Sequence, residues 1–214
     1  MTCQHCKEAD TIFKPWMVNP TLKRYRKKGP DKVTQIIIDT LQAKGLSKAT
    51  LTDVGAGIGV IHHELLGNGV VKVFHIDASE NFLKLAKEES KRKNQLSKVT
   101  FIKADFVDLD SNLPESNIVA MDKVICCYPD ANALLQKAAD KATNTIAMSF
   151  PKENIFFKTV VFFSNLSRKL RKRAFRNYIH KESIIESILQ QEGFHLEFQS
   201  ETFMWKIRVY EKTI

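Results

Sequence analysis

Three aspartates in the first half of the chain stand at or near the ends of apolar, β-branched runs, which are typical of buried strands. They are Asp53 in the run 50–54, Asp77 after the run 70–76, and Asp105 after the run 99–103. Because ligands of open α/β sheets bind beyond the carboxyl ends of the strands, we expect these carboxylates to face one ligand. Ionised carboxylates only accept hydrogen bonds, so that ligand should carry amine and hydroxyl groups.

A glycine-rich turn follows the first of these strands in the stretch 51–60, which reads LTDVGAGIGV. Glycine suits such a turn because the backbone must take positive φ and lie close to a ligand. The helix that follows directs its free N–H groups at the turn and favours an anionic group there. A phosphate-binding loop is excluded because no Lys-Ser/Thr pair closes the turn. The dinucleotide fingerprint fails because Val60 stands at the position of its last glycine.

The remaining pattern, Asp-x-Gly-x-Gly-x-Gly from Asp53 to Gly59, resembles the first motif of class I S-adenosylmethionine-dependent methyltransferases. The resemblance implies that S-adenosylmethionine is the cofactor and that Asp53 and the carbonyl of Cys126 hold its ammonium group. The other positions that match are Gly55, Ala56, Gly57 and Gly59 for the methionine part, Asp77 and Ala78 for the ribose, and Asp105 and Phe106 for the adenine.

Strand-like and helix-like segments alternate after residue 50, which predicts a parallel sheet with helices on both sides. Further strands are expected at 118–127 and 143–150, helices after the caps Asp31 and Ser79 and at 131–141 and 182–192, and a hairpin at 195–200 and 203–211. This pattern predicts an α/β fold. The resemblance makes it the Rossmann-like, seven-stranded class I methyltransferase fold, mostly parallel with a C-terminal antiparallel hairpin.

The length of 214 residues suits one domain with a single core. We divide it into an N-terminal arm with helices (1–45), a cofactor-binding core (46–150), a basic and aromatic insertion (151–180), and a C-terminal helix with the hairpin (181–214).

Candidate catalytic residues stand at the end of the fourth predicted strand, where Cys126, Cys127 and Tyr128 should face the transferred methyl. This segment, with 149–152 and 178–180, resembles magnesium-protoporphyrin O-methyltransferases and their bacterial relatives, in which a histidine stands at the place of Cys127. The resemblance makes His180 the first candidate base for the acceptor's proton. Tyr25 is the second, on a basic arm at 25–30 that has no apolar face of its own and is expected over the ligand cleft or on the surface.

The N-terminal Cys3-Gln4-His5-Cys6 contains a C-x-x-C, which can be half of a zinc site or a redox pair. The other two cysteines are adjacent, an awkward spacing for two ligands of one tetrahedral site, and we predict no metal site. The alternatives are a reduced tail, or a segment that folds over the active site and meets Cys127. In the second case, the thiols could hold a soft acceptor such as a metalloid.

The insertion at 152–178 is aromatic in its first half and basic in its second. It is expected to form an amphipathic helix pair on the sheet edge, a lid with an apolar wall and a cationic rim, or a membrane-surface contact. The formal charge of +9, from 33 Lys and Arg against 24 Asp and Glu, favours acidic partners in general.

The sequence contains no apolar run long enough to cross a membrane and no signal peptide, so we expect a soluble cytoplasmic protein. We predict a methyltransferase that acts on a small, anionic acceptor, preferably at oxygen. The alternatives are a thiol or metalloid methyltransferase that uses Cys127 with Cys3 or Cys6, and a nucleic-acid or protein methyltransferase. Nucleic acid is not favoured, because the Asn/Asp-Pro-Pro-aromatic motif of adenine methylation is missing.

Overall fold

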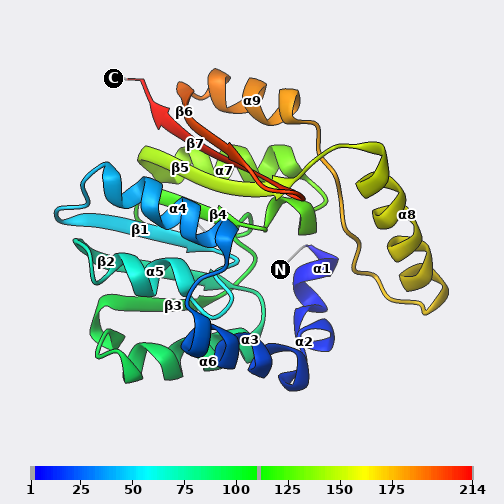
Figure 1. The fold of residues 1–214 in the computed structure, drawn as a ribbon, viewed down its shortest axis with the longest axis horizontal. Coiled ribbons are helices and arrows are strands. Elements are labelled where there is room, and N and C mark those ends of the chain that lie inside the picture. The colour runs from blue at the N-terminus through cyan, green and yellow to red at the C-terminus, as the bar shows by residue number, and fades with distance from the viewer. Residues whose placement is uncertain (1–2, 110–111, 214) are drawn as a thin grey trace.

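The structure is a computed structural model that describes residues 3–109 and 112–213. Within these residues the chain forms one seven-stranded sheet covered by helices (Figure 1). The strands are β1 (Ala49–Val54), β2 (Val70–Asp77), β3 (Val99–Lys103), β4 (Ser116–Asp122), β5 (Ala142–Pro151), β6 (Phe194–Glu201) and β7 (Trp205–Lys212). Their order is β3-β2-β1-β4-β5-β7-β6, with β1 to β5 parallel and β7 antiparallel to both of its neighbours. The predicted fold class, with its closing hairpin, is confirmed.

The helices connect these strands and cover the sheet. They are α1 (Gln4–Lys7), α2 (Ala9–Ile12), α3 (Pro15–Lys28), α4 (Lys32–Ala43), α5 (Val60–Leu65), α6 (Glu80–Arg92), α7 (Ala131–Lys141), α8 (Ile155–Leu170) and α9 (Glu182–Gln191), with 3-10 turns η1 (Leu96–Lys98) and η2 (Ile125–Cys127). Two predicted N-caps are confirmed. The Asp31 side chain accepts hydrogen bonds from the first turn of α4, and the Ser79 hydroxyl accepts one from α6.

Neighbouring residues of each central strand point to opposite faces of the sheet, so the sheet has a core on both sides. On β5, Ala147 packs into the cluster that includes α4 and α5, whereas Ile146 and Met148 pack into the cluster that includes α7 and α9. This two-sided burial explains why the central strands read as nearly continuous apolar runs.

The fourth strand is shorter than predicted, because β4 ends at Asp122 and not at residue 127. Lys123 has a φ of 63°, and its N–H donates to the hydroxyl of Ser149 instead of continuing the ladder. The following apolar residues are buried in the turn η2, with Ile125 fully buried, so their pattern reflects burial but not strand geometry.

One alternative for the insertion was a helix pair, but it forms a single helix, α8, followed by an irregular segment at 173–181. The basic residues after Leu170 offer no periodic apolar face with which a second helix could pack. The helix stands apart from the sheet at one side of the molecule (Figure 1). Its outward face exposes large apolar side chains, namely Ile155, Phe156, Val160, Phe162, Phe163, Leu166 and Leu170.

The basic arm was expected to lack an apolar face, and this expectation is wrong. Helix α3 begins at Pro15, so Val18, Leu22 and Tyr25 recur at helical spacing and are buried. Among the described residues, no helix has both the length and the apolar character that a membrane crossing requires.

Candidate active site

Three adjoining cavities at the carboxyl ends of the strands all contact Gly55. Their volumes are about 200, 70 and 150 Å³. They lie where β1 is flanked by β2 on one side and β4 on the other, so that connections leave in opposite directions. This switch point is the usual ligand site of open α/β sheets.

The predicted glycine turn lies at this point. Gly55, Gly57 and Gly59 have φ values of 57°, 57° and 81°, which place all three in the left-handed region that favours glycine. A Cβ on Gly55 would lie 2.7 Å from the side chain of Val124, and one on Gly59 would lie 2.1 Å from the ring of His62. Side chains are therefore excluded at both positions by sterics as well as by backbone conformation.

Asp53 is 2% exposed, and its Oδ2 lies 2.9 Å from Nδ1 of His62. Burial raises the pKa of Asp53 to about 8, with a further contribution from the Asp122 carboxylate, and burial lowers the pKa of His62 to about 3. The contact has the geometry of an ion pair, but both shifts favour the uncharged forms. At neutral pH the two side chains therefore share a hydrogen bond between neutral groups.

Asp77 connects the end of β2 to the glycine turn. Its Oδ2 accepts the N–H of Gly57 and its Oδ1 accepts that of Ser79, both at 2.8 Å. Burial raises the pKa of Asp77 to about 6 despite these hydrogen bonds. The neighbouring Ala78 lines two of the three cavities.

Asp105 and Phe106 line the smallest cavity, together with Asp77 and Ala78. The Oδ1 atom of Asp105 accepts the Tyr128 hydroxyl at 2.9 Å and the Val107 N–H at 3.2 Å. Its Oδ2 atom is buried and has no hydrogen-bond partner among the described residues. All three predicted aspartates therefore lie around the same group of cavities.

Cys126 and Cys127 lie beside this region, with their Sγ atoms 3.8 Å apart. The hydrogen bond from Cys126 lowers the pKa of the Cys127 thiol against the opposing effect of burial, and Arg168 lowers it further. Cys127 lines the 150 Å³ cavity. The carbonyl of Cys126, expected near the cofactor's ammonium, accepts the N–H of Tyr178 at 2.7 Å.

The two residues predicted as bases are placed differently. His180 stacks on Tyr178 and its Nε2 lies 3.1 Å from the carbonyl of Tyr128, outside the lining of the three cavities. Tyr25 is 5% exposed, stacks on His63 and donates its hydroxyl to Glu64 at 2.5 Å. Burial and this carboxylate raise the pKa of Tyr25 well above its ordinary value, so the phenol stays protonated in this position.

The N-terminal segment covers the site. His5 and Cys6 line the 150 Å³ cavity together with Cys127. The imidazole of His5 lies between Phe175 and Tyr178, with ring centroids 5.1 and 5.6 Å away, and its Nδ1 is 3.0 Å from the carbonyl of Cys127. This arrangement agrees with the alternative in which the segment folds over the active site.

Sequence reasoning missed a polar network that lines the largest of the three cavities. Asp122 accepts hydrogen bonds from Thr34 at 2.6 Å and from Ser149 at 2.5 Å. The Nζ of Lys123 bonds both Asp122 and Asp31. An acidic residue at a strand end was the available signal, but it was hidden because the strand was extended past Asp122.

Arg168 of α8 was also missed as an individual residue. Its guanidinium lies 5.0 Å from the ring centroid of Phe175, and its charge acts on Cys127. Its Nη1 atom is buried and has no hydrogen-bond partner among the described residues.

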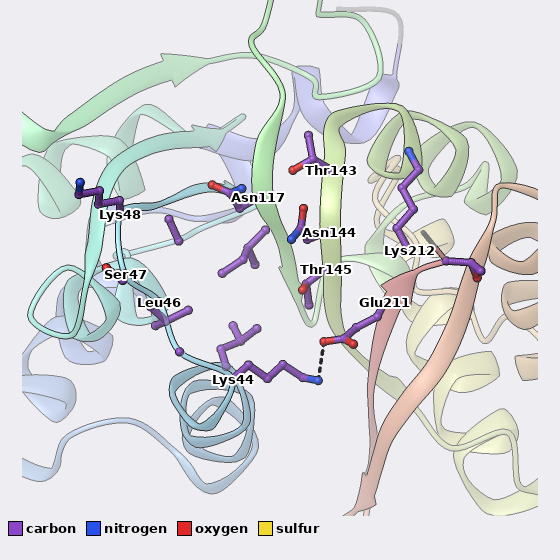
Figure 2. A pocket seen from close by; sticks show the side chains of 15 residues that line it. Lys44, Leu46, Ser47, Lys48, Asn117, Thr143, Asn144, Thr145, Glu211 and Lys212 are labelled. Atoms are coloured by element: carbon purple, nitrogen blue, oxygen red, sulfur yellow. Dashed lines mark hydrogen bonds and ion pairs between the residues drawn. The ribbon is translucent and has the colours of Figure 1, made fainter.

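A larger cavity, of about 670 Å³, lies at the amino ends of β1, β4 and β5 (Figure 2). Figure 2 shows its polar lining, including the ion pair between Lys44 and Glu211 at 2.6 Å. This cavity lacks the glycine turn and lies at the opposite ends of the strands from Gly55. We therefore assign the functional site to the carboxyl ends of the strands.

The comparisons with known proteins identify the family of the chain. A family model described as a methyltransferase domain matches residues 46–196. The magnesium protoporphyrin IX methyltransferase of Synechocystis PCC 6803, solved with S-adenosylhomocysteine, is 20% identical, with a TM-score of 0.69 over 95% of this chain and 99% of that one. The same enzyme solved with S-adenosylmethionine gives a TM-score of 0.67 at 19% identity over 99% of each chain.

An O-methyltransferase family protein from Burkholderia thailandensis is 10% identical, with a TM-score of 0.70 over 97% of this chain and 63% of that one. A comparison with curated proteins gave no match. The family model covers more than half of the chain, and the solved structures share its fold. The chain therefore belongs to the methyltransferase-domain family and is an enzyme of the class I S-adenosylmethionine-dependent methyltransferases.

Proposed function

We propose that this enzyme transfers the methyl group of S-adenosylmethionine to an oxygen atom of a small, anionic acceptor. The glycine turn would carry the methionine part of the cofactor, with Asp53 at its ammonium. Asp77 would bind the ribose hydroxyls and Asp105 the adenine amine. The location of all three carboxylates around the cavities that meet at Gly55 supports these assignments.

Arg168 is the observation that carries the acceptor class. A buried guanidinium nitrogen without a hydrogen-bond partner is costly, and a ligand oxygen would remove that cost. Carboxylate and phosphate match the planar guanidinium best, because they can accept two parallel hydrogen bonds. Arg168 does not itself line the three cavities, so an acceptor with such a group would extend from the cavity at Cys127 toward α8.

His5 is the residue best placed to take a proton from a hydroxyl acceptor. Carbonyl oxygens cannot donate, so the contact with Cys127 requires the hydrogen on Nδ1, which leaves Nε2 of the neutral ring as an acceptor. By the same argument the hydrogen of His180 is on Nε2, which leaves its Nδ1 as an acceptor. His5 lines the cavity that Cys127 also lines, whereas His180 does not, so we place His5 first and retain His180.

The reaction then needs little beyond positioning. The acceptor oxygen attacks the methyl carbon in line with the carbon–sulfur bond, and the electron pair of the broken bond stays on sulfur as S-adenosylhomocysteine leaves. Arg168 orients the acceptor, and the closed site excludes water from it. A hydroxyl acceptor passes its proton to His5, whereas a carboxylate acceptor needs no base.

Binding of S-adenosylhomocysteine, measured by calorimetry, tests the cofactor assignment, and Asp77→Asn and Asp105→Asn should each weaken it at least about tenfold. Turnover of a panel of carboxylates, phenols, thiols and arsenite, followed as S-adenosylhomocysteine formation, tests the acceptor. Arg168→Met should raise the KM for anionic acceptors about 10- to 100-fold, as expected for a lost charged hydrogen bond. Its exposed neighbour supplies the control Lys169→Met, which should leave KM unchanged.

The base assignment is tested by comparing His5→Gln with His180→Gln. For a hydroxyl acceptor, His5→Gln should lower kcat. If only His180→Gln has this effect, the assignment of the base passes to His180.

A thiol or metalloid methyltransferase is the second candidate, favoured by the lowered pKa of the Cys127 thiol. A thiolate can hold a soft acceptor directly. Cys127→Ser would then abolish turnover of thiols and arsenite, whereas the O-methyltransferase should tolerate this near-isosteric change.

A further inference from the structure

Two thiols and one carboxylate from distant parts of the chain meet at the adenine end of the cavities. The Sγ atoms of Cys3 and Cys6 and a carboxylate oxygen of Asp105 all lie within 4.8 Å of one another. Neither cysteine is in a disulfide, and Cys3 and Asp105 are only 9% and 1% exposed. The C-x-x-C spacing supplied half of a site, and the fold supplies a third ligand from almost a hundred residues away.

One carboxylate oxygen of Asp105 is free to take a ligand, either the adenine amine of the cofactor or a cation. Its Oδ2 is buried and has no hydrogen-bond partner among the described residues, although Oδ1 has two. An unsatisfied buried carboxylate oxygen carries a large desolvation cost.

We propose that Cys3, Cys6 and Asp105 form a binding site for a thiophilic divalent cation such as Zn²⁺. Two sulfur ligands and one oxygen ligand select this class, because magnesium and calcium prefer oxygen alone. Tetrahedral zinc with bonds of about 2.0–2.3 Å separates its ligand atoms by roughly 3.3–3.8 Å, so atoms that lie within 4.8 Å of one another need to approach by at most roughly 1.0–1.5 Å. The fourth position stays open to an exogenous ligand.

Occupancy of this site blocks the cofactor, a consequence that rests on the proposed function because it uses Asp105 as the adenine ligand. The cation engages the same carboxylate, and Cys6 lines the two cavities that Asp77 and Ala78 also line. The cation also fixes the N-terminal segment over the adenine end. Zinc and S-adenosylmethionine therefore compete, and zinc acts as a reversible inhibitor.

Cobalt(II) serves as the spectroscopic probe for the cation site. Titration of the reduced protein should give sulfur-to-cobalt charge-transfer absorption and the visible bands of tetrahedral cobalt. Cys3→Ser, Cys6→Ser and Asp105→Asn should each weaken cobalt binding at least tenfold. Cys126→Ser is the matched control, since it also removes one thiol of four and should bind cobalt as the wild type does. Wild-type cobalt binding by Cys3→Ser and Cys6→Ser, or equal loss in Cys126→Ser, overturns the proposal.

Competition is tested by calorimetry of S-adenosylhomocysteine with and without Zn²⁺. Zinc should raise the apparent Kd of the wild type at least tenfold and leave that of Cys6→Ser unchanged. An unchanged Kd in the wild type overturns the inhibitory role. If S-adenosylhomocysteine binds neither with nor without zinc, the proposed function fails, whereas the cobalt spectra still decide the cation site.

Discussion

Asp53 is a buried carboxyl group for which a proton and the ammonium of a ligand would compete. Its pKa of about 8 means that it is mostly protonated at pH 7 in the free enzyme. A cationic group placed against it would lower this pKa, since an opposite charge favours the ionised carboxylate.

Cofactor binding should therefore release up to one proton at pH 7. Calorimetry of S-adenosylhomocysteine in phosphate and in Tris should give different apparent enthalpies at pH 7, because the two buffers take up protons with different heats. The difference should shrink at pH 9, where Asp53 is mostly ionised, and vanish in Asp53→Asn. Equal enthalpies in both buffers at pH 7 would mean that the ammonium does not contact Asp53.

His75 makes a second prediction at the level of single residues. It is fully buried between His62 and Phe101, and neither ring nitrogen has a hydrogen-bond partner among the described residues. Burial lowers its pKa well below 6.5. The unfolded chain therefore binds a proton on this residue that the folded chain does not, and stability falls as the pH drops below 6.5.

Replacing His75 with Phe should remove this part of the acid sensitivity. The slope of unfolding free energy against pH should decrease by up to about 1.4 kcal/mol per pH unit between pH 5 and 6.5. Urea unfolding at pH 5 and pH 8 measures the effect. His195→Gln, at an exposed histidine, should behave as the wild type. Equal acid losses in His75→Phe and the wild type would contradict the shifted pKa.

At the scale of elements, α8 is distinctive because it buries only a narrow face and leaves its large apolar side chains exposed to solvent. Phe162 and Phe163 are 63% and 61% exposed, while Arg168 on the inner side approaches Cys127. A helix with this division can close over an amphiphilic acceptor, with the guanidinium at its charged group and the aromatic rings at its apolar part.

The double variant Phe162→Ser/Phe163→Ser tests whether α8 acts as a lid. Its unfolding free energy should stay within about 0.5 kcal/mol of the wild type for each replaced side chain, because both are exposed. Its KM for an apolar anionic acceptor should rise several-fold at nearly constant kcat. Leu96→Ser, another exposed apolar residue, is the control. An unchanged KM with lost binding to anionic vesicles would favour a membrane contact instead.

At the scale of the whole molecule, the site is completed only when the N-terminal segment returns to the carboxyl edge of the sheet. Asp10 holds it there through the Ser79 hydroxyl at 3.0 Å and Lys103 at 3.1 Å. The bonds of Asp10 are partly exposed, and the segment adds no strand to the sheet, so it can open without unfolding the sheet.

Asp10→Ala should therefore speed cofactor release with little loss of stability. We expect the dissociation rate of S-adenosylhomocysteine, measured by stopped-flow displacement, to rise several-fold while the thermal midpoint stays near that of the wild type. Glu80→Ala is the matched control, because Glu80 also pairs with Lys103 but belongs to α6. Equal rates in Asp10→Ala and the wild type would argue that the segment is not a gate.

The local signals in the sequence were sufficient for the sheet, the caps and the glycine turn, because each depends on nearby residues. The end of β4 was not predictable, since a lysine at Lys123 gives no sign of positive φ. The role of His5 depends on its contact with Cys127, and that of Arg168 on its charge acting on Cys127, across many intervening residues. The exposure of the phenylalanines on α8 was also hidden, because an apolar periodic face ordinarily predicts burial.

The turn at Lys123 marks the boundary between two parts of the site that are held by different segments of the chain. The segment after it is fixed to the C-terminal half of the chain, through Ser149 at Lys123 and through Tyr178 at the carbonyl of Cys126. The groups proposed to grip the methyl donor belong instead to β1, β2 and β3. Val124 and Tyr128 also line the cavity of Asp77 and Asp105, so changes there would reach the donor. Changes at Cys127 and on α8 touch none of the groups proposed to bind the donor, so they can alter which molecule is methylated while donor binding is kept.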